Sequence, residues 1–206
     1  MNPPRELALA TANLHKVREI SHMLADLRVQ VRSLADFPGV ELPPETGETF
    51  EANARIKAVS LAEATGDRAL ADDSGLEVDA LDGQPGVLSN RFAGDGASDE
   101  AKIAKVLDLL GDTPAEQRTA RFRCVMALAD AEGRTWTVEG ICPGRIAEFP
   151  RGSGGFGYDP IFLPDGRSCT MAELTMDQKN RISHRGRALR AMVQVLTRLG
   201  AAAGPR

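Results

Sequence analysis

Two adjacent carboxylates, Asp72 and Asp73, follow a short apolar segment in the stretch Ala-Leu-Ala-Asp-Asp-Ser-Gly-Leu at 69–76. An acidic pair at the end of a strand can bind a hard cation such as Mg2+ and can orient a water molecule. Aspartate, serine and glycine also favour turns, so this stretch alone is better interpreted as a surface turn. A site is favoured only if other parts of the chain supply cationic and phosphate-binding partners.

One candidate partner lies near the N-terminus, where the polar segment 11–16 (Thr-Ala-Asn-Leu-His-Lys) follows an apolar run at 7–10. Asn13 can cap a helix that begins near Lys16, because apolar residues recur three and four positions apart from there. The backbone N–H groups at a helix start suit an anion. Without a ligand, the same segment is a capped helix with a solvated lysine.

A second candidate lies on the helix predicted between about 50 and 65. Asn53 and Lys57 are four residues apart and are therefore neighbours on its surface. Glu45 ends a proline-rich loop just before this helix and provides a third carboxylate. These side chains matter for chemistry only if their face of the helix lies against the acidic pair; otherwise they are solvated.

The segment 152–160 (Gly-Ser-Gly-Gly-Phe-Gly-Tyr-Asp-Pro) matches the pattern G-x-G-x-x-G. The dinucleotide-binding fingerprint requires a helix directly after the glycines, whereas residues 161–163 resemble a strand. Phe156, Tyr158 and Asp159 are unusual residues for a flexible linker. A ligand-binding loop and a linker therefore both remain open.

Further along the chain, cationic and imidazole side chains lie near the start of the last predicted helix, at Lys179, His184 and Arg185. With Asp159 they could contact polar base edges, while Phe156 could stack on a base. The lysines and Asn13 could bind phosphate oxygens, and the carboxylates could bind Mg2+. This inventory suits a nucleoside triphosphate hydrolase. The sequence has no G-x-S-x-G elbow, no H-E-x-x-H motif and no P-loop.

The elements that must position these residues follow from periodicity and punctuation. Helices are predicted at 16–24, at about 50–65 with Gly66 as the stop, at 98–110, and at 183–199. Strands are predicted at 7–10, 29–34, from 69 to the acidic pair at 72–73, at 77–81, 121–130, 135–142 and 161–163, with a further candidate at 145–149. The strands 121–130 and 135–142 form a hairpin, and 89–94 is a polar loop or strand edge.

Composition limits the partners. The chain has 206 residues and a net charge of −4, so a broad surface for nucleic acid or an anionic membrane is not expected. Three scattered cysteines and an N-terminus without an apolar region predict a cytoplasmic protein. No linker interrupts the sequence, which predicts one domain of two lobes over 1–200 and a flexible tail at 201–206.

Five spaced motifs resemble those of the inosine/xanthosine triphosphate pyrophosphatases, also called the Ham1 family. They are T-A-N-L-H-K at 11–16, E-T-G-E-T-F-E-A-N-A at 45–54, A-D-D-S-G-L at 71–76, G-G-F-G-Y-D-P at 154–160 and I-S-H-R-G at 182–186. The resemblance covers about residues 7–199. It implies an elongated single α/β domain with a long mixed twisted sheet, helices flanking two lobes and a cleft between them, and it implies a homodimer.

The implied activity is Mg2+-dependent hydrolysis of ITP, dITP or XTP to the monophosphate and pyrophosphate, which cleanses the nucleotide pool. By the same resemblance the catalytic residues are Asp73, Lys16 and Lys57. The metal ligands are Glu45, Asp73 and, less directly, Asp72. The substrate-binding residues are Thr11, Ala12, Asn13, Leu14, His15, Lys16, Asn53, Ser74, Phe156, Gly157, Tyr158, Asp159, Lys179, His184 and Arg185.

Two residues depart from the family pattern. Ala52 stands where many members carry an acidic residue, and Ala12 stands where a glycine is frequent. Three other functions remain as alternatives: a nucleotide-dependent enzyme of another class such as a dehydrogenase, a non-catalytic module that binds nucleotide or RNA, and a pyrophosphatase for other modified nucleotides.

Overall fold

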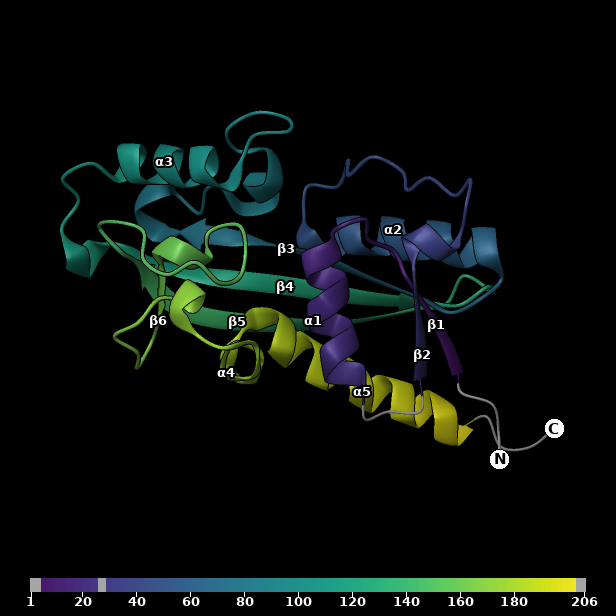
Figure 1. Cartoon of the computed structure of the whole chain (residues 1–206). Coiled ribbons are helices and arrows are strands. Elements are labelled where there is room, and N and C mark those ends of the chain that lie inside the picture. Colours follow the sequence, from purple (N-terminus) through teal and green to yellow (C-terminus); the bar gives the residue numbers. More distant parts are fainter. Residues whose placement is uncertain (1–4, 26–28, 203–206) are drawn as a thin grey trace. The chain divides into compact units, whose positions relative to one another are not determined.

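The computed structural model describes residues 5–25 and 29–202. The chain folds as an α/β protein around a six-stranded sheet in the order β2-β1-β3-β4-β5-β6 (Figure 1). β1 pairs in parallel with β2 and β3, whereas β5 and β6 are antiparallel, so the sheet is mixed. The strands are Arg5–Leu9 (β1), Val29–Ser33 (β2), Ala69–Val78 (β3), Thr119–Ala129 (β4), Thr135–Ile146 (β5) and Phe162–Pro164 (β6).

The α-helices of the described residues are Leu14–Leu24 (α1), Phe50–Thr65 (α2), Asp99–Leu110 (α3), Met176–Ile182 (α4) and His184–Ala202 (α5). Their ends follow local chemistry. Asn13 caps α1 by accepting the N–H groups of His15 and Lys16, as predicted. Thr49 caps α2, and Gly66 ends that helix at a left-handed φ of 72°, which favours glycine.

The chain divides into two compact units. The first consists of Met1–Asp73, Cys124–Gly140 and Gly186–Arg206, and the second of Ser74–Arg123 and Ile141–Arg185. The core of the first unit is built by β1, the amphipathic face of α1, and apolar residues from β3, β4 and α5. Its buried members are Leu7, Leu9, Ile20, Leu24, Leu70, Cys124, Met126, Leu128, Ala188, Leu189 and Met192.

The core of the second unit packs α3 with residues of the strands and of the glycine-rich segment. It contains Leu76, Val78, Phe92, Ile103, Val106, Leu110, Ala120, Phe122, Cys142, Ile146, Tyr158, Ile161, Phe162 and Met171. α3 contributes Ile103, Val106 and Leu110, which recur at three- and four-residue intervals on one face of the helix. Tyr158 therefore anchors the glycine-rich segment in the same core as α3.

Several predicted boundaries were wrong. The turn expected at 72–75 does not occur, because β3 runs unbroken through it to Val78. The strand predicted over 77–81 gives way to a 3-10 turn at Asp79–Leu81, and Gly86–Arg91 is also 3-10 rather than a strand edge. No separate strand forms at 145–149, because β5 itself continues to Ile146 and ends there.

Two further corrections concern helices. α4 was not predicted, because seven residues are too few for a periodic signal, although Thr175 and Gln178 form a capping box at its start. α5 extends to Ala202, beyond the predicted stop, and residues 203–206 of the predicted tail lie outside the described part. No helix within 5–25 and 29–202 is long and apolar enough to cross a membrane.

Candidate active-site residues

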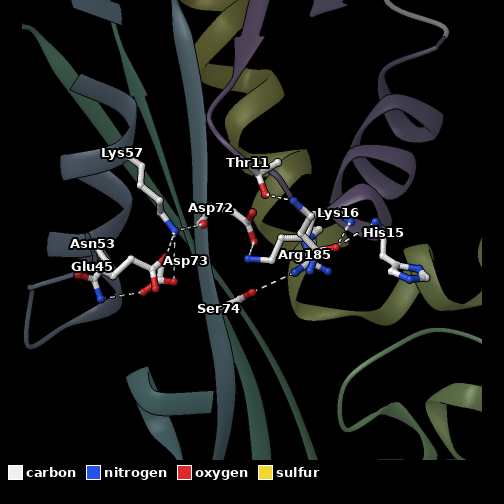
Figure 2. Close-up of polar contacts among 11 residues, drawn as sticks. Thr11, His15, Lys16, Glu45, Asn53, Lys57, Asp72, Asp73, Ser74 and Arg185 are labelled. Carbon is white, nitrogen blue, oxygen red and sulfur yellow. Dashed lines mark hydrogen bonds and ion pairs between the residues drawn. The ribbon is translucent and has the colours of Figure 1, made fainter. Parts of the chain in front are cut away.

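In the first unit, Lys57 of α2 lies at the centre of a group of carboxylates. Its Nζ is 2.5 Å from Glu45 Oε1, 2.8 Å from the carbonyl oxygen of Asp72 and 3.4 Å from Asp73 Oδ1 (Figure 2). We call Glu45, Asn53, Lys57 and Asp73 the lysine–carboxylate cluster. The face of α2 that carries Asn53 and Lys57 therefore lies against Asp73, which was the condition for a functional site.

Burial and charge act together on the two central groups of this cluster. Burial alone would lower the pKa of Lys57, but the carboxylates of Asp73, Asp72 and Glu45 outweigh it and raise that pKa. Lys57 is therefore an ammonium at neutral pH. Burial raises the pKa of Asp73 above its usual range; Lys57 opposes this shift, whereas Glu45 reinforces it. A carboxylate with a raised pKa is a stronger base than an ordinary surface aspartate.

Asn53 connects the cluster to the loop before α2. It is 0% exposed, its Nδ2 donates to Asp73 Oδ2 at 3.1 Å, and its Oδ1 accepts the backbone N–H of Gly47 at 2.7 Å. Because the N–H of Gly47 can only be accepted by the amide oxygen, this contact fixes which end of the amide faces Asp73. Asn53, predicted to bind substrate, thus contacts a carboxylate from a fully buried position.

Asp72 lies on the other side of β3. Adjacent side chains of a strand point to opposite faces, and the carboxylate of Asp72 accordingly pairs with Lys16 of α1 at 3.0 Å rather than with Lys57 (Figure 2). Of the three carboxylates predicted to bind metal, Glu45 and Asp73 approach a common cation, the Lys57 ammonium, and Asp72 approaches Lys16. Among the described residues no three carboxylate, imidazole or thiol side chains gather to hold a metal by themselves.

The segment 11–16 forms the start of α1. The hydroxyl of Thr11 accepts the N–H of Asn13, and Asn13 Oδ1 accepts the N–H groups of His15 and Lys16. An anion there would therefore interact chiefly with the Lys16 ammonium and the positive end of the helix. Ala12 has a negative φ, so alanine replaces glycine here without strain. The side chains of Ala12, Leu14 and His15 are exposed.

In the second unit, Asp159 organises the predicted base-binding residues. Its Oδ2 accepts both the Lys179 ammonium at 2.6 Å and the N–H of Phe156 at 2.9 Å. The charged groups of Lys179 and Arg185 lie 4.9 and 5.4 Å from the centre of the Phe156 ring. Arg185 Nη2 also donates to Ser74 Oγ at 2.9 Å (Figure 2). Four of the predicted residues are thus brought around Phe156 or joined to it through Arg185.

The remaining predicted residues of this unit lie deeper. His184 is 5% exposed and stacks on Phe122 at 4.7 Å. Tyr158 is buried, its hydroxyl donates to the carbonyl oxygen of Ser89 at 2.9 Å, and burial raises its pKa. Its side chain therefore fixes the glycine-rich segment to the core beneath it rather than reaching the surface.

The contacts of two residues of the candidate site were not predicted from the sequence, although one of them, Gly47, lies in the motif at 45–54. Gly47 matters through its backbone N–H and because a Cβ there would lie 2.7 Å from Asn53 Oδ1. Asp99 was predicted only as part of the helix at 98–110, yet its Oδ2 accepts the N–H of Gly157 at 2.5 Å. Both contacts depend on tertiary structure rather than on residue type.

The dinucleotide-binding alternative is excluded by the local fold. After Gly157 the chain forms a short 3-10 turn, Asp159–Ile161, and then β6, rather than the helix that the fingerprint requires.

Comparison with known proteins gives consistent matches. A model of the Ham1 family matches residues 7–195. A dITP/XTP pyrophosphatase from Desulforamulus reducens is 52% identical over 194 residues, covering 94% of this chain and 96% of that protein. A solved HAM1 protein from Coxiella burnetii superposes with a TM-score of 0.86 at 44% identity, covering 94% of this chain and 99% of that one. A solved nucleoside-triphosphatase / dITP/XTP pyrophosphatase from Mycobacterium abscessus has a TM-score of 0.74 at 48% identity, with coverages of 91% and 98%.

Proposed function

The chain belongs to the Ham1 family, and on that premise we propose that it hydrolyses the triphosphates of deaminated purines, ITP, dITP and XTP, to the monophosphate and pyrophosphate. The observation that carries this proposal is the lysine–carboxylate cluster. A buried ammonium and a carboxylate of raised pKa lie in contact there. Such a pair can stabilise phosphate charge and accept a proton from water. Removal of these triphosphates would cleanse the nucleotide pool.

Magnesium fits the cluster as a cofactor. Glu45 and Asp73 offer hard carboxylate oxygens that already converge on one cation, Lys57 Nζ. Mg2+ is commonly held by one or two carboxylates together with substrate phosphates, so a third protein ligand is not needed. We assign Glu45 and Asp73 as its ligands and Asp72 as the partner of Lys16. When bound, the metal neutralises phosphate charge.

Asp73 is the proposed general base. Its carboxylate accepts a proton from a water molecule whose oxygen forms a bond to the α-phosphorus. The bond between that phosphorus and the bridging oxygen to the β-phosphorus breaks, and its electron pair leaves with pyrophosphate. Lys57 offsets the negative charge that develops, and Asn53 keeps the Asp73 carboxylate oriented.

Phosphate binding falls to the start of α1. Lys16 is 15% exposed, so its ammonium can reach a ligand while it contacts Asp72. The side chains of Thr11 and Asn13 accept backbone N–H groups within the segment 11–16. The backbone of Ala12, Leu14 and His15 is part of the same segment. These groups are proposed to bind the triphosphate through the Lys16 charge and the helix dipole.

Base selection is proposed to reside in the second unit, where Phe156 stacks on the purine. The guanidinium of Arg185 or backbone N–H groups donate to a 6-keto oxygen, whereas a 6-amino group would set donor against donor. Each unpaired buried donor costs about 1–3 kcal/mol, so two or three mismatches reject ATP strongly. Lys179 and Asp159 hold the ring in place.

A product assay tests the function. The protein is incubated with Mg2+ and separately with ITP, XTP, dITP, ATP, GTP and a modified pyrimidine triphosphate, and the products are identified. We expect pyrophosphate from the first three and little turnover of the others. Release of inorganic phosphate, or equal rates with ATP and ITP, would refute the proposal. Equal rates with a modified pyrimidine triphosphate would favour the broader pyrophosphatase.

The variant Asp73→Asn separates catalysis from simple binding. We expect this variant to retain the fold and bind ITP but to lose turnover. In a non-catalytic binding module, the substitution would leave the protein's function, nucleotide binding, unchanged. A homodimer, implied by the resemblance, and a cytoplasmic location, predicted from composition, remain part of the proposal, as does the absence of a nucleic-acid partner. Sedimentation of the purified protein and its affinity for RNA at varied salt test the first and the last of these.

A further inference from the structure

Packing restrains the glycine-rich segment that carries Phe156 least at Gly157. Gly155 and Gly157 have φ of 73° and 61°, in the left-handed region that favours glycine. A Cβ added at Gly157 would meet nothing within 4 Å, whereas one at Gly152, Gly154 or Gly155 would lie within 3 Å of Ala172 or Asp159, so the packing is loosest at Gly157. At Gly157, hydrogen bonds rather than packing must therefore fix the backbone that carries the Phe156 ring.

Two carboxylates supply those hydrogen bonds from different elements. Asp159 accepts the N–H of Phe156 at 2.9 Å, and Asp99 accepts the N–H of the next residue, Gly157, at 2.5 Å. Asp159 is local to the segment, but Asp99 is 58 residues away from Gly157 in the chain. Hydrogen bonds to an ionised acceptor are roughly twice as strong as neutral ones. The peptide groups on both sides of the Phe156 Cα, which carries the ring, are therefore each held by a carboxylate.

Asp99 is itself well fixed. It is the first residue of α3, where the helix dipole favours a negative charge, and its Oδ1 lies 2.7 Å from the ammonium of Lys102. α3 packs Ile103 and Val106 into the core that also contains Tyr158. The anchor and the far end of the glycine-rich segment thus rest on one packed core.

From this geometry we infer that Asp99 is a positioning residue that orients Phe156 for stacking on the substrate base. Asp99 acts through the backbone of Gly157 and does not itself contact the nucleotide. The inference rests on the proposed function. It adds a determinant of base affinity and selectivity that lies on α3, outside all five motifs of the resemblance.

The test compares Asp99→Ala with Asp99→Asn and Glu100→Ala. Asp99→Asn keeps an oxygen that can accept the N–H of Gly157, so it should restore much of the function. Glu100→Ala removes the neighbouring charge from the first turn of the same helix, where Glu100 is hydrogen-bonded to Ser98 and its own backbone. It controls for the loss of a negative charge at the helix start.

For Asp99→Ala we expect KM for ITP to rise about tenfold and kcat to stay within about twofold, with a weaker preference for ITP over ATP. Inhibition by inorganic triphosphate, which has no base, should not change. Amide hydrogen exchange at Phe156 and Gly157 should accelerate in Asp99→Ala but not in Glu100→Ala. In a Phe156→Ala background, Asp99→Ala should have little further effect on KM, because both changes remove the same interaction.

Several results would overturn the inference: additive effects of the two substitutions on KM, a loss of kcat at constant KM, equal weakening of inorganic triphosphate, or unchanged exchange at Gly157. Failure of the wild-type protein to release pyrophosphate from ITP would instead overturn the proposed function, and with it the role of Asp99 in base binding. The exchange measurement separates these two failures because it does not depend on turnover.

Discussion

Replacing Asn53 with alanine distinguishes its structural position from the role predicted by the sequence. The substitution removes the amide that donates to Asp73 Oδ2 and accepts the N–H of Gly47. If Asn53 binds substrate, as predicted, KM should rise while kcat is retained. If it orients the general base, kcat should fall while KM stays within about twofold.

The structure sets the size of the effect. The lost hydrogen bond has a charged acceptor and a fully buried donor, and such a bond contributes about 1.5–3 kcal/mol. If most of that is needed to hold Asp73 during attack, kcat falls roughly 10- to 100-fold. The free energy of unfolding should fall by about 2–3 kcal/mol, because a cavity and an unsatisfied carboxylate oxygen remain.

Two further variants control this measurement. Gly47→Ala would place a Cβ 2.7 Å from Asn53 Oδ1 and from Ala52 Cβ. It should displace the Asn53 amide and lower kcat, as Asn53→Ala does, without altering Asp73. Gly66→Ala strains the other end of the same helix at a φ of 72°. It should cost about 1 kcal/mol of stability and leave kcat unchanged.

The assay is steady-state release of pyrophosphate from ITP, with stability from urea denaturation of each variant. A tenfold rise in KM at unchanged kcat for Asn53→Ala would refute the orienting role and support direct substrate contact. An equal loss of kcat in Gly66→Ala would show that destabilising α2 is sufficient to explain the effect.

Three other substitutions test the remaining contacts. Glu45→Gln should raise the Mg2+ concentration for half-maximal rate by about tenfold, measured by metal titration, and an unchanged requirement would remove Glu45 from the metal site. Lys57→Met leaves buried carboxylates without their ammonium and should lower the free energy of unfolding, measured in urea, by up to about 3–5 kcal/mol. Adding Asp73→Asn should restore part of this loss of stability. Strictly additive effects of the two substitutions on stability would contradict the pairing. Tyr158→Phe should cost about 1 kcal/mol of stability through the lost bond to Ser89 and leave kcat unchanged, so a large loss of activity would indicate a direct role.

The parts of the fold that were predictable from the sequence are those with local causes. Asn13 and Gly66 mark helix ends through their own side chain or backbone freedom, and the structure has α1 and α2 where these signals placed them. The contact of Asp99 with Gly157 has no such local cause, because it depends on how α3 packs in its core. The helix α4 was missed since its seven residues are stabilised by a cap and by packing rather than by a periodic apolar stripe.

The acidic pair shows why residue type and spacing were insufficient at the centre of the site. At the end of a strand, Asp72 and Asp73 could bind one metal together, and the sequence was interpreted with the strand ending at this pair. They lie instead within an unbroken strand of ten residues, whose alternation sends consecutive side chains to opposite faces. Asp72 therefore pairs with Lys16 and Asp73 with Lys57, each with an ammonium from a different helix. The two carboxylates have different partners because the backbone of β3 is extended, so these pairings could be derived only once the secondary structure at 72–75 was known.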